Sequence, residues 1–156
     1  MIAFWVEGVP VQQGSKIPGI AKRKSGPRAG QPYAFMRESS DRKLRPWRTD
    51  IVTAARHAMA GRPKFVGPVG LSIDFHFPPL KSDPLRYWRY TAPDLSKLIR
   101  AVEDALTDAE VWEDDARVCE YGRMRKFHSN TPGASIRVWQ LTTAEPHNNN
   151  DNIIHL

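Results

Sequence analysis

The stretch Leu95-Ser-Lys-Leu-Ile-Arg-Ala-Val-Glu-Asp-Ala-Leu106 decides how the rest of the sequence is interpreted. Its apolar residues recur every three or four positions, at Leu95, Leu98, Ile99, Val102 and Leu106. This spacing places them in one stripe along an α-helix. A helix with a single apolar stripe buries it against another layer of structure. The stretch therefore predicts a helix that packs on a sheet or on another helix.

Strands are predicted on both sides of this helix. Residues 69–77 alternate between apolar and polar side chains, as expected for a strand with one buried face. Downstream, residues 118–127 and 134–141 are predicted as two strands joined by a turn at 128–133. A short apolar strand is predicted at residues 2–6, because Gly8 and Pro10 follow it closely.

A second helix is predicted over residues 41–60, where apolar residues recur at helical spacing and Gly61 and Pro63 follow. Residues 12–32 contain four glycines and three prolines without periodicity, and this composition predicts a long functional loop. The resulting order is β-α-β-α-β-β. It indicates an α+β fold in which a small mixed sheet is packed by two main helices. We expect one domain over residues 1–143, followed by a disordered polar tail at 144–156.

Charge is unevenly distributed along the 156 residues. The segment from Val11 to Arg48 contains ten of the 23 lysines and arginines but only two of the 17 acidic residues, so its net charge is +8. A basic segment beside a more acidic remainder favours a polyanionic partner and a separate acidic site. The nucleic-acid-binding residues predicted here are Lys16, Lys22, Arg23, Lys24, Arg28, Arg45 and Arg48.

The composition also limits the cellular setting and the chemistry. A single cysteine, Cys119, forms no internal disulfide and excludes a zinc site that needs two or more cysteines. No signal peptide is recognisable, and no apolar run approaches the roughly 20 residues that span a bilayer. We therefore expect a cytoplasmic protein with no membrane partner.

Acidic residues gather around the 95–106 helix. Asp94 precedes it, Asp104 lies in it, and Asp114 and Asp115 lie in the loop before the next strand. Because elements that are neighbours in sequence tend to pack together, we expect the aspartate pair beside the helix. Clustered carboxylates repel one another and suit a hard divalent ion such as magnesium. Such an ion activates water and neutralises the leaving oxygen in phosphodiester hydrolysis.

Each of these acids also has a structural interpretation. Asp94 could cap the helix, Asp104 could pair with Arg100, and Asp114-Asp115 could be a polar turn. The residue types alone leave both interpretations open.

Two stretches together resemble a known family. They are Thr91-Ala-Pro-Asp-Leu-Ser-Lys-Leu-Ile-Arg-Ala-Val-Glu-Asp-Ala-Leu-Thr107 and Val111-Trp-Glu-Asp-Asp115. They are similar to the core motif of RusA-type Holliday-junction resolvases. In that motif a Pro-Asp helix start and an Asp-Ala-Leu helix end are followed by an aspartate pair before a strand. The combined pattern is specific, although less than a quarter of the chain carries it.

The resemblance implies a RusA-like fold and a magnesium-dependent endodeoxyribonuclease that acts in DNA recombination and repair. It implies a homodimer that binds four-way DNA junctions and nicks them symmetrically. By position, Asp94 is the first metal carboxylate, and Asp114 and Asp115 form the second cluster. Arg100 falls where the family commonly has a catalytic lysine.

The sequence departs from the family motif at one position. The second carboxylate of the helix start is replaced by Ser96, which is a weaker, neutral ligand. Glu103, seven residues later, returns to within about 20° of Ser96 around a helix, at a distance of about 10 Å along its axis. It is therefore a candidate fourth metal ligand, with an exposed ion pair to Arg100 as the alternative.

Two other functions remain open. A protein without a carboxylate at position 96 could be a non-catalytic DNA-binding module of the same fold. The run of arginines and aromatic rings at residues 86–90 suits unpaired bases, so an RNA-binding or RNA-processing protein is the second alternative.

Overall fold

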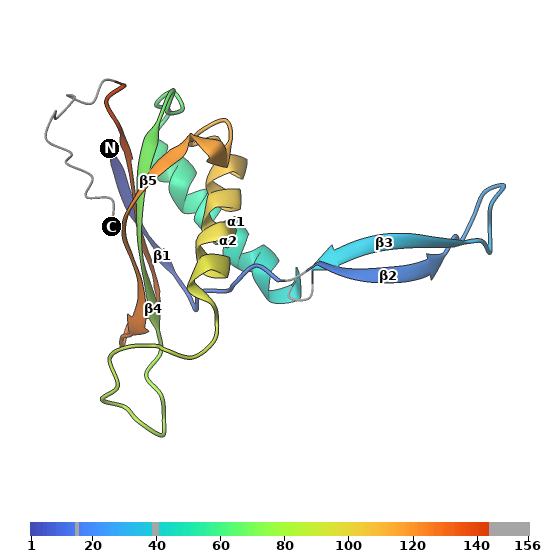
Figure 1. Cartoon of the computed structure of the whole chain (residues 1–156), viewed down its shortest axis with the longest axis horizontal. Helices are drawn as coiled ribbons and strands as arrows, with labels where there is room; N and C mark the ends of the chain where they lie inside the picture. Colours follow the sequence, from blue (N-terminus) through green and yellow to red (C-terminus); the bar gives the residue numbers. More distant parts are fainter. Residues whose placement is uncertain (15, 39–40, 144–156) are drawn as a thin grey trace, which may run out of the picture.

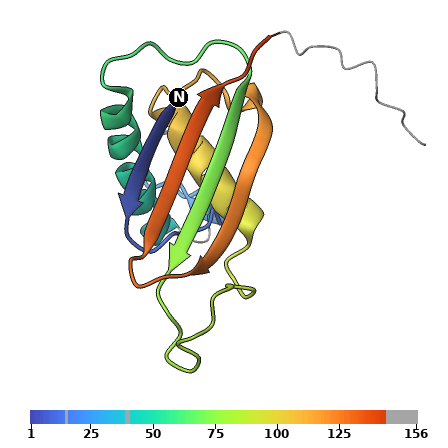
Figure 2. The same cartoon turned by 90° about the vertical axis from the view of Figure 1, so that its left-hand side faces the viewer.

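A computed structural model describes residues 1–14, 16–38 and 41–143 of the chain. A four-stranded sheet runs through the domain, and both helices lie on one of its faces (Figures 1 and 2). The spatial order of the strands is β1-β6-β4-β5. Their bounds are Ile2–Glu7 for β1, Val69–Phe77 for β4, Val118–His128 for β5 and Gly133–Gln140 for β6. The helices are α1, Asp41–Met59, and α2, Leu95–Asp108.

The sheet is mixed. β6 pairs antiparallel with both β1 and β4, whereas β4 and β5 run parallel. A parallel pair needs a crossover connection, and here the crossover is the segment between β4 and β5 that contains α2. The predicted α+β class, with two main helices on a mixed sheet, is confirmed.

The core lies between the sheet and the helices. The alternating residues Leu71, Ile73 and Phe75 of β4 are fully buried, and so are Leu98 and Leu106 of the α2 stripe. Burying one such side chain is worth about 1.5–3 kcal/mol. The period-2 pattern of β4 and the helical period of α2 therefore supply the two surfaces that meet in the core.

The predicted loop at residues 12–32 is wrong in part, because much of it forms a β-hairpin. β2, Lys16–Lys22, pairs antiparallel with β3, Pro32–Glu38, in a separate two-stranded sheet. Figure 1 shows this hairpin, called the arm below, standing away from the rest of the domain. The hydrophobic core, as far as the structure describes it, includes no residue of β2 or β3.

Local contacts join the two strands of the arm. The ring of Phe35 lies against Gly19, where a Cβ atom would come within 2.6 Å of the ring. Arg23 lies over the ring of Tyr33, 5.3 Å from its centroid. Gly26 and Gly30 both take positive φ in the connecting turn, a conformation that favours glycine.

The expected tail at 144–156 lies outside the described residues. In the described part of the chain, no helix is both long and apolar enough to cross a membrane.

Candidate active site and nucleic-acid surfaces

The carboxylate of Asp94 is available at the start of α2. Asp94 has an extended backbone, with φ −70° and ψ 135°, and its side chain makes no capping hydrogen bond. Its backbone N–H donates to Oε1 of Gln12 at 2.8 Å. The side chain is 62 % exposed and lies 3.3 Å from Nζ of Lys97. The residue therefore occupies the cap position without using its carboxylate as the cap, and that carboxylate is exposed and paired only with the exposed Lys97 side chain among the ion pairs of the described residues.

Glu103 is a buried carboxylate on α2. It is 8 % exposed, and the hydroxyl of Tyr121 on β5 donates a hydrogen bond to its Oε1 at 2.5 Å. Asp115 lies close enough for its charge to act on both Glu103 and Tyr121. Glu103 and Asp115 therefore lie within electrostatic range of each other near the α2–β5 boundary. We call these two carboxylates the acidic pair.

The electrostatics of the acidic pair show a shortage of positive charge. Burial raises the pKa of Glu103, and the charges of Asp115 and Asp104 raise it further, against the Tyr121 hydrogen bond and the charge of Arg100. Burial and the hydrogen bond to Glu103 raise the pKa of Tyr121 to about 12. A bound cation would favour the ionised form of Glu103.

The other predicted catalytic residues lie around the acidic pair in different roles. Asp114 caps the short 3-10 helix η1, Asp115–Arg117, by accepting a hydrogen bond from the N–H of Ala116 at 2.8 Å. Arg100 is exposed on α2, and its charge favours the ionised form of Glu103. Asp104 forms its ion pair with Arg48 of α1, at 3.9 Å between Nη1 and Oδ2, rather than with Arg100 as its structural interpretation suggested.

The donor set suits magnesium, although the structure does not gather three carboxylates. Within residues 1–14, 16–38 and 41–143, no three His, Cys, Asp or Glu side chains lie close enough to hold a metal ion. Magnesium keeps several of its waters and needs only one or two carboxylates besides substrate phosphates. The all-oxygen acidic pair meets that requirement, and Asp94 supplies a further exposed carboxylate at the start of the same helix.

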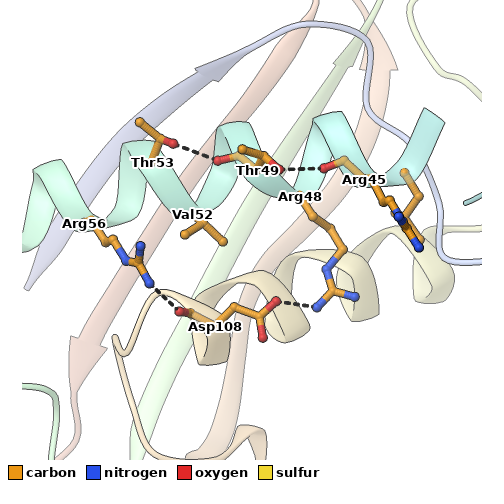
Figure 3. A pocket seen from close by; sticks show the side chains of 8 residues that line it. Arg45, Arg48, Thr49, Val52, Thr53, Arg56 and Asp108 are labelled. Carbon is orange, nitrogen blue, oxygen red and sulfur yellow. Dashed lines mark hydrogen bonds and ion pairs between the residues drawn. The ribbon is translucent and has the colours of Figure 1, made fainter. Parts of the chain in front are cut away.

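A basic groove lies on the other side of α2, where it packs against α1 (Figure 3). Arg45, Arg48 and Arg56 of α1 line it together with Asp108 of α2. Arg48 forms an ion pair with the Asp108 carboxylate, and Arg56 donates to the Asp108 carbonyl oxygen at 3.0 Å. Arg48 thus helps to join the two helices through its ion pair. Four predicted DNA-binding residues of the arm are exposed, namely Lys22, Arg23, Lys24 and Arg28. Lys16 lies in β2.

Comparison with known proteins assigns the chain to a family. The family model of endodeoxyribonuclease RusA matches residues 20–139, which is 120 of the 156 residues. The chain belongs to the RusA family. No curated protein matches it.

The RusA match contains every element that forms the site: α1, α2, η1 and β5. Membership of the family implies an endodeoxyribonuclease that resolves Holliday junctions, and so a nuclease whose partner is branched DNA. The match begins inside β2, so most of the arm and the whole of both helices lie within it.

Two residues near the RusA site did not emerge from the sequence. Tyr121 holds Glu103, and Lys126 of β5 donates from Nζ to the carbonyl oxygens of Thr91 at 2.8 Å and of Pro93. Burial and Arg89 lower the pKa of Lys126, while the charge of Asp94 acts to raise it. Both side chains lie on a strand predicted from its sequence, but only the parallel pairing of β4 and β5 brings that strand beside α2.

Proposed function

We propose that this RusA-family protein is a magnesium-dependent endodeoxyribonuclease that nicks four-way DNA junctions symmetrically as a homodimer, in DNA recombination and repair. The observation that carries the proposal is the acidic pair of Glu103 and Asp115, which lies within the family match. The acidic pair supports metal-assisted cleavage, and the basic arm supports a phosphate-rich substrate.

Glu103 and Asp115 would hold the magnesium ion. Asp94 and Asp114 are the other two ligands that the RusA motif implies, although no three carboxylates gather among the described residues. When bound, the ion supplies activation of water and stabilisation of charge on the leaving oxygen. Tyr121 keeps the buried carboxylate of Glu103 in place through its hydrogen bond. Arg100, exposed near that carboxylate, would contact the scissile phosphate, because a guanidinium matches the geometry of phosphate oxygens.

The arm and α1 would hold the DNA branches of the junction by contacting their phosphates. Lys22, Arg23, Lys24 and Arg28 are exposed around the turn of the arm, and Arg45 lines the groove between the helices. Such phosphate contacts fix the position of a duplex without reading its sequence. This arrangement suits a nuclease that selects its substrate by shape.

The deciding experiment is a nicking assay on a synthetic four-way junction, with and without magnesium. Paired nicks on opposing strands in magnesium, and intact junction in a chelator, are the expected results. A linear duplex of the same sequence serves as the control for structure selectivity. Equal cutting of duplex and junction would remove the junction from the proposal.

One observation favours a second candidate, a DNA-binding module that does not cleave. Position 96 carries a serine, and no three-carboxylate cluster forms among the described residues. Tight junction binding without any nick, in magnesium or manganese, would select this candidate. Stronger binding of RNA than of junction DNA would contradict both.

A further inference from the structure

The face of the sheet that the helices leave uncovered carries two tryptophans and three arginines. Figure 2 shows this open face toward the viewer, with α1 and α2 behind the sheet. The residues of β6 that alternate with the buried Ala134, Ile136 and Val138 point outward here. They are Ser135, Arg137 and Trp139.

Two tryptophans lie flat on this face because glycines lie beneath them. A Cβ atom at Gly70 would come within 2.1 Å of the indole of Trp139, and one at Gly122 within 2.9 Å of the same ring. At Gly133 a Cβ atom would lie 2.2 Å from the indole of Trp5. Both rings therefore lie close over the backbone of the neighbouring strands. Trp5 is 39 % exposed, and His76 makes a T-shaped contact with its ring.

Three arginines lie on the same face of the sheet. Arg123 and Arg125 both donate to the carboxylate of Asp74, at 2.8 and 2.7 Å. Arg137 is exposed and has no acidic partner among the residues that the structure describes. Two guanidinium groups thus share the carboxylate of Asp74 and that of Arg137 lies outside the pairing, so these four side chains carry a net positive charge.

A hollow of about 190 Å³ lies beside these arginines, lined by Ser72, Asp74, Arg123, Ser135 and Arg137 together with Ile73. At about 30 Å³ per water molecule it has room for several waters, and so for a phosphate group. Ser135 pairs with Trp5 across β1 and β6, and Trp139 lies four residues further along β6. At about 3.4 Å per residue, Arg137 therefore lies about 7 Å along the strand from both Ser135 and Trp139.

We propose that this open face binds an unpaired DNA strand, with bases stacked on Trp5 and Trp139 and a phosphate held at Arg137 and Arg123. Aromatic rings and arginines on a sheet are a general means of binding single strands, because every base has a π-face and every linkage a negative charge. The surface goes beyond the proposed junction-cutting site, since it lies on the opposite side of the sheet from α2. It would hold a strand that has come unpaired near the branch point.

The test is binding of a fluorescein-labelled oligo(dT) of about 16 nucleotides, an upper site size for one such platform, by the full-length protein in a chelator. Arg137→Gln and Trp139→Leu should each weaken binding, the second by about five- to 150-fold, the range that stacking of one base gives. Arg62→Gln is the matched control, because it removes the same charge from an exposed arginine near the end of α1. Since Arg137 is exposed, its variant tests the proposal even if Trp139→Leu disturbs the sheet.

Photocrosslinking provides a second measurement. A 5-iodouracil oligonucleotide should form adducts at Trp5 or Trp139, whereas adducts confined to the arm would overturn the proposal. Tighter binding of oligo(rU) than of oligo(dT) would overturn the assignment to DNA. If Arg137→Gln instead converts a dimer to a monomer and leaves oligonucleotide binding unchanged, the face is an interface between copies of the chain and the proposal fails.

Nicking of an intact junction, measured on the same variants, separates this proposal from the proposed function. Suppose that the wild-type protein nicks junctions and that its affinity for oligo(dT) equals that of Arg137→Gln. This result would refute the proposal for the open face and leave the proposed function intact. A protein that binds oligo(dT) through Arg137 but never nicks a junction would refute the nuclease function and leave the surface in place.

Discussion

Asp94 carries a carboxylate that the fold does not use. Its side chain makes no cap hydrogen bond and is largely exposed, so Asp94→Asn should leave the free energy of unfolding nearly unchanged. We expect it to abolish junction cleavage while preserving junction binding. Nicking and gel-shift assays on the same preparation measure both, with the exposed Asp50→Asn on α1 as the control. Cleavage at the wild-type rate would remove Asp94 from the metal site.

Substitution of Glu103 tests whether this residue, about two helical turns from Ser96, replaces the carboxylate missing there. Glu103→Gln keeps an oxygen that can accept the Tyr121 hydrogen bond and keeps helix propensity, but it loses the ligand charge. It should therefore raise the magnesium concentration needed for half-maximal cleavage. The double variant Ser96→Asp with Glu103→Gln should restore the wild-type midpoint. An unshifted midpoint in the single variant would show that Glu103 is structural.

Asp74 links stability to pH on the open face. Burial raises its pKa, but the hydrogen bonds and charges of Arg125 and Arg123 outweigh burial and lower it below 3.8. A pKa lower in the folded state means that folding favours the ionised form, so the stabilisation is present above pH 3.8 and is lost as pH falls through the folded value. Urea unfolding should show Asp74→Asn less stable than wild type at neutral pH, with the gap closing in acid. A gap that is constant with pH would contradict this.

The sequence identified Asp94, Asp115 and Glu103 as candidates because helix start, aspartate pair and helical angle are local features. It gave no indication of Tyr121 or Lys126, whose contacts with α2 and with the turn before it depend on where β5 lies in the sheet. A strand residue shows which face it occupies through alternation, but its partner on another element follows only from tertiary packing.

At the scale of elements, the arm is separate from the described core, and its proposed role is to bind DNA phosphates. Neutralising Lys22, Arg23 and Lys24 together should keep the fold, because the described core contains no residue of β2 or β3. If each cation contacts a phosphate, the slope of log affinity against log salt should fall by roughly three, at about 0.9 per contact. Fluorescence anisotropy on junction DNA at several salt concentrations measures the slope. An unchanged slope would place the arm outside the interface.

The helices and strands that bury one face in the core could be predicted from the sequence, whereas the β2–β3 hairpin of the arm could not. β4 was predicted with its observed bounds, and α1 to within one residue, because alternation and helical spacing record contact with the core. The arm buries neither face in the core, so it shows no period of two. Pro18 and Gly19, which usually interrupt strands, lie inside β2, where Gly19 accommodates the ring of Phe35.

For the whole molecule, we expect a dimer with two-fold symmetry. A junction offers two equivalent strands for cutting, and a closed two-fold interface matches that geometry. Light scattering at micromolar concentration should give twice the mass of the chain, and activity should rise faster than linearly with protein as the dimer forms. A monomeric mass with strictly linear activity would contradict it.

The parallel pairing of β4 and β5 has a consequence for the order of events in folding. Asp94, Glu103 and Asp115 all lie on the crossover between these two strands, and Tyr121 lies on the second of them. Long-range parallel pairings form late, because the entropy of closing a long loop must be overcome first. Glu103 meets Tyr121 only when β5 docks beside β4. If Glu103 and Asp115 form the catalytic site, we expect a newly made chain to cleave no DNA until β5 has joined the sheet.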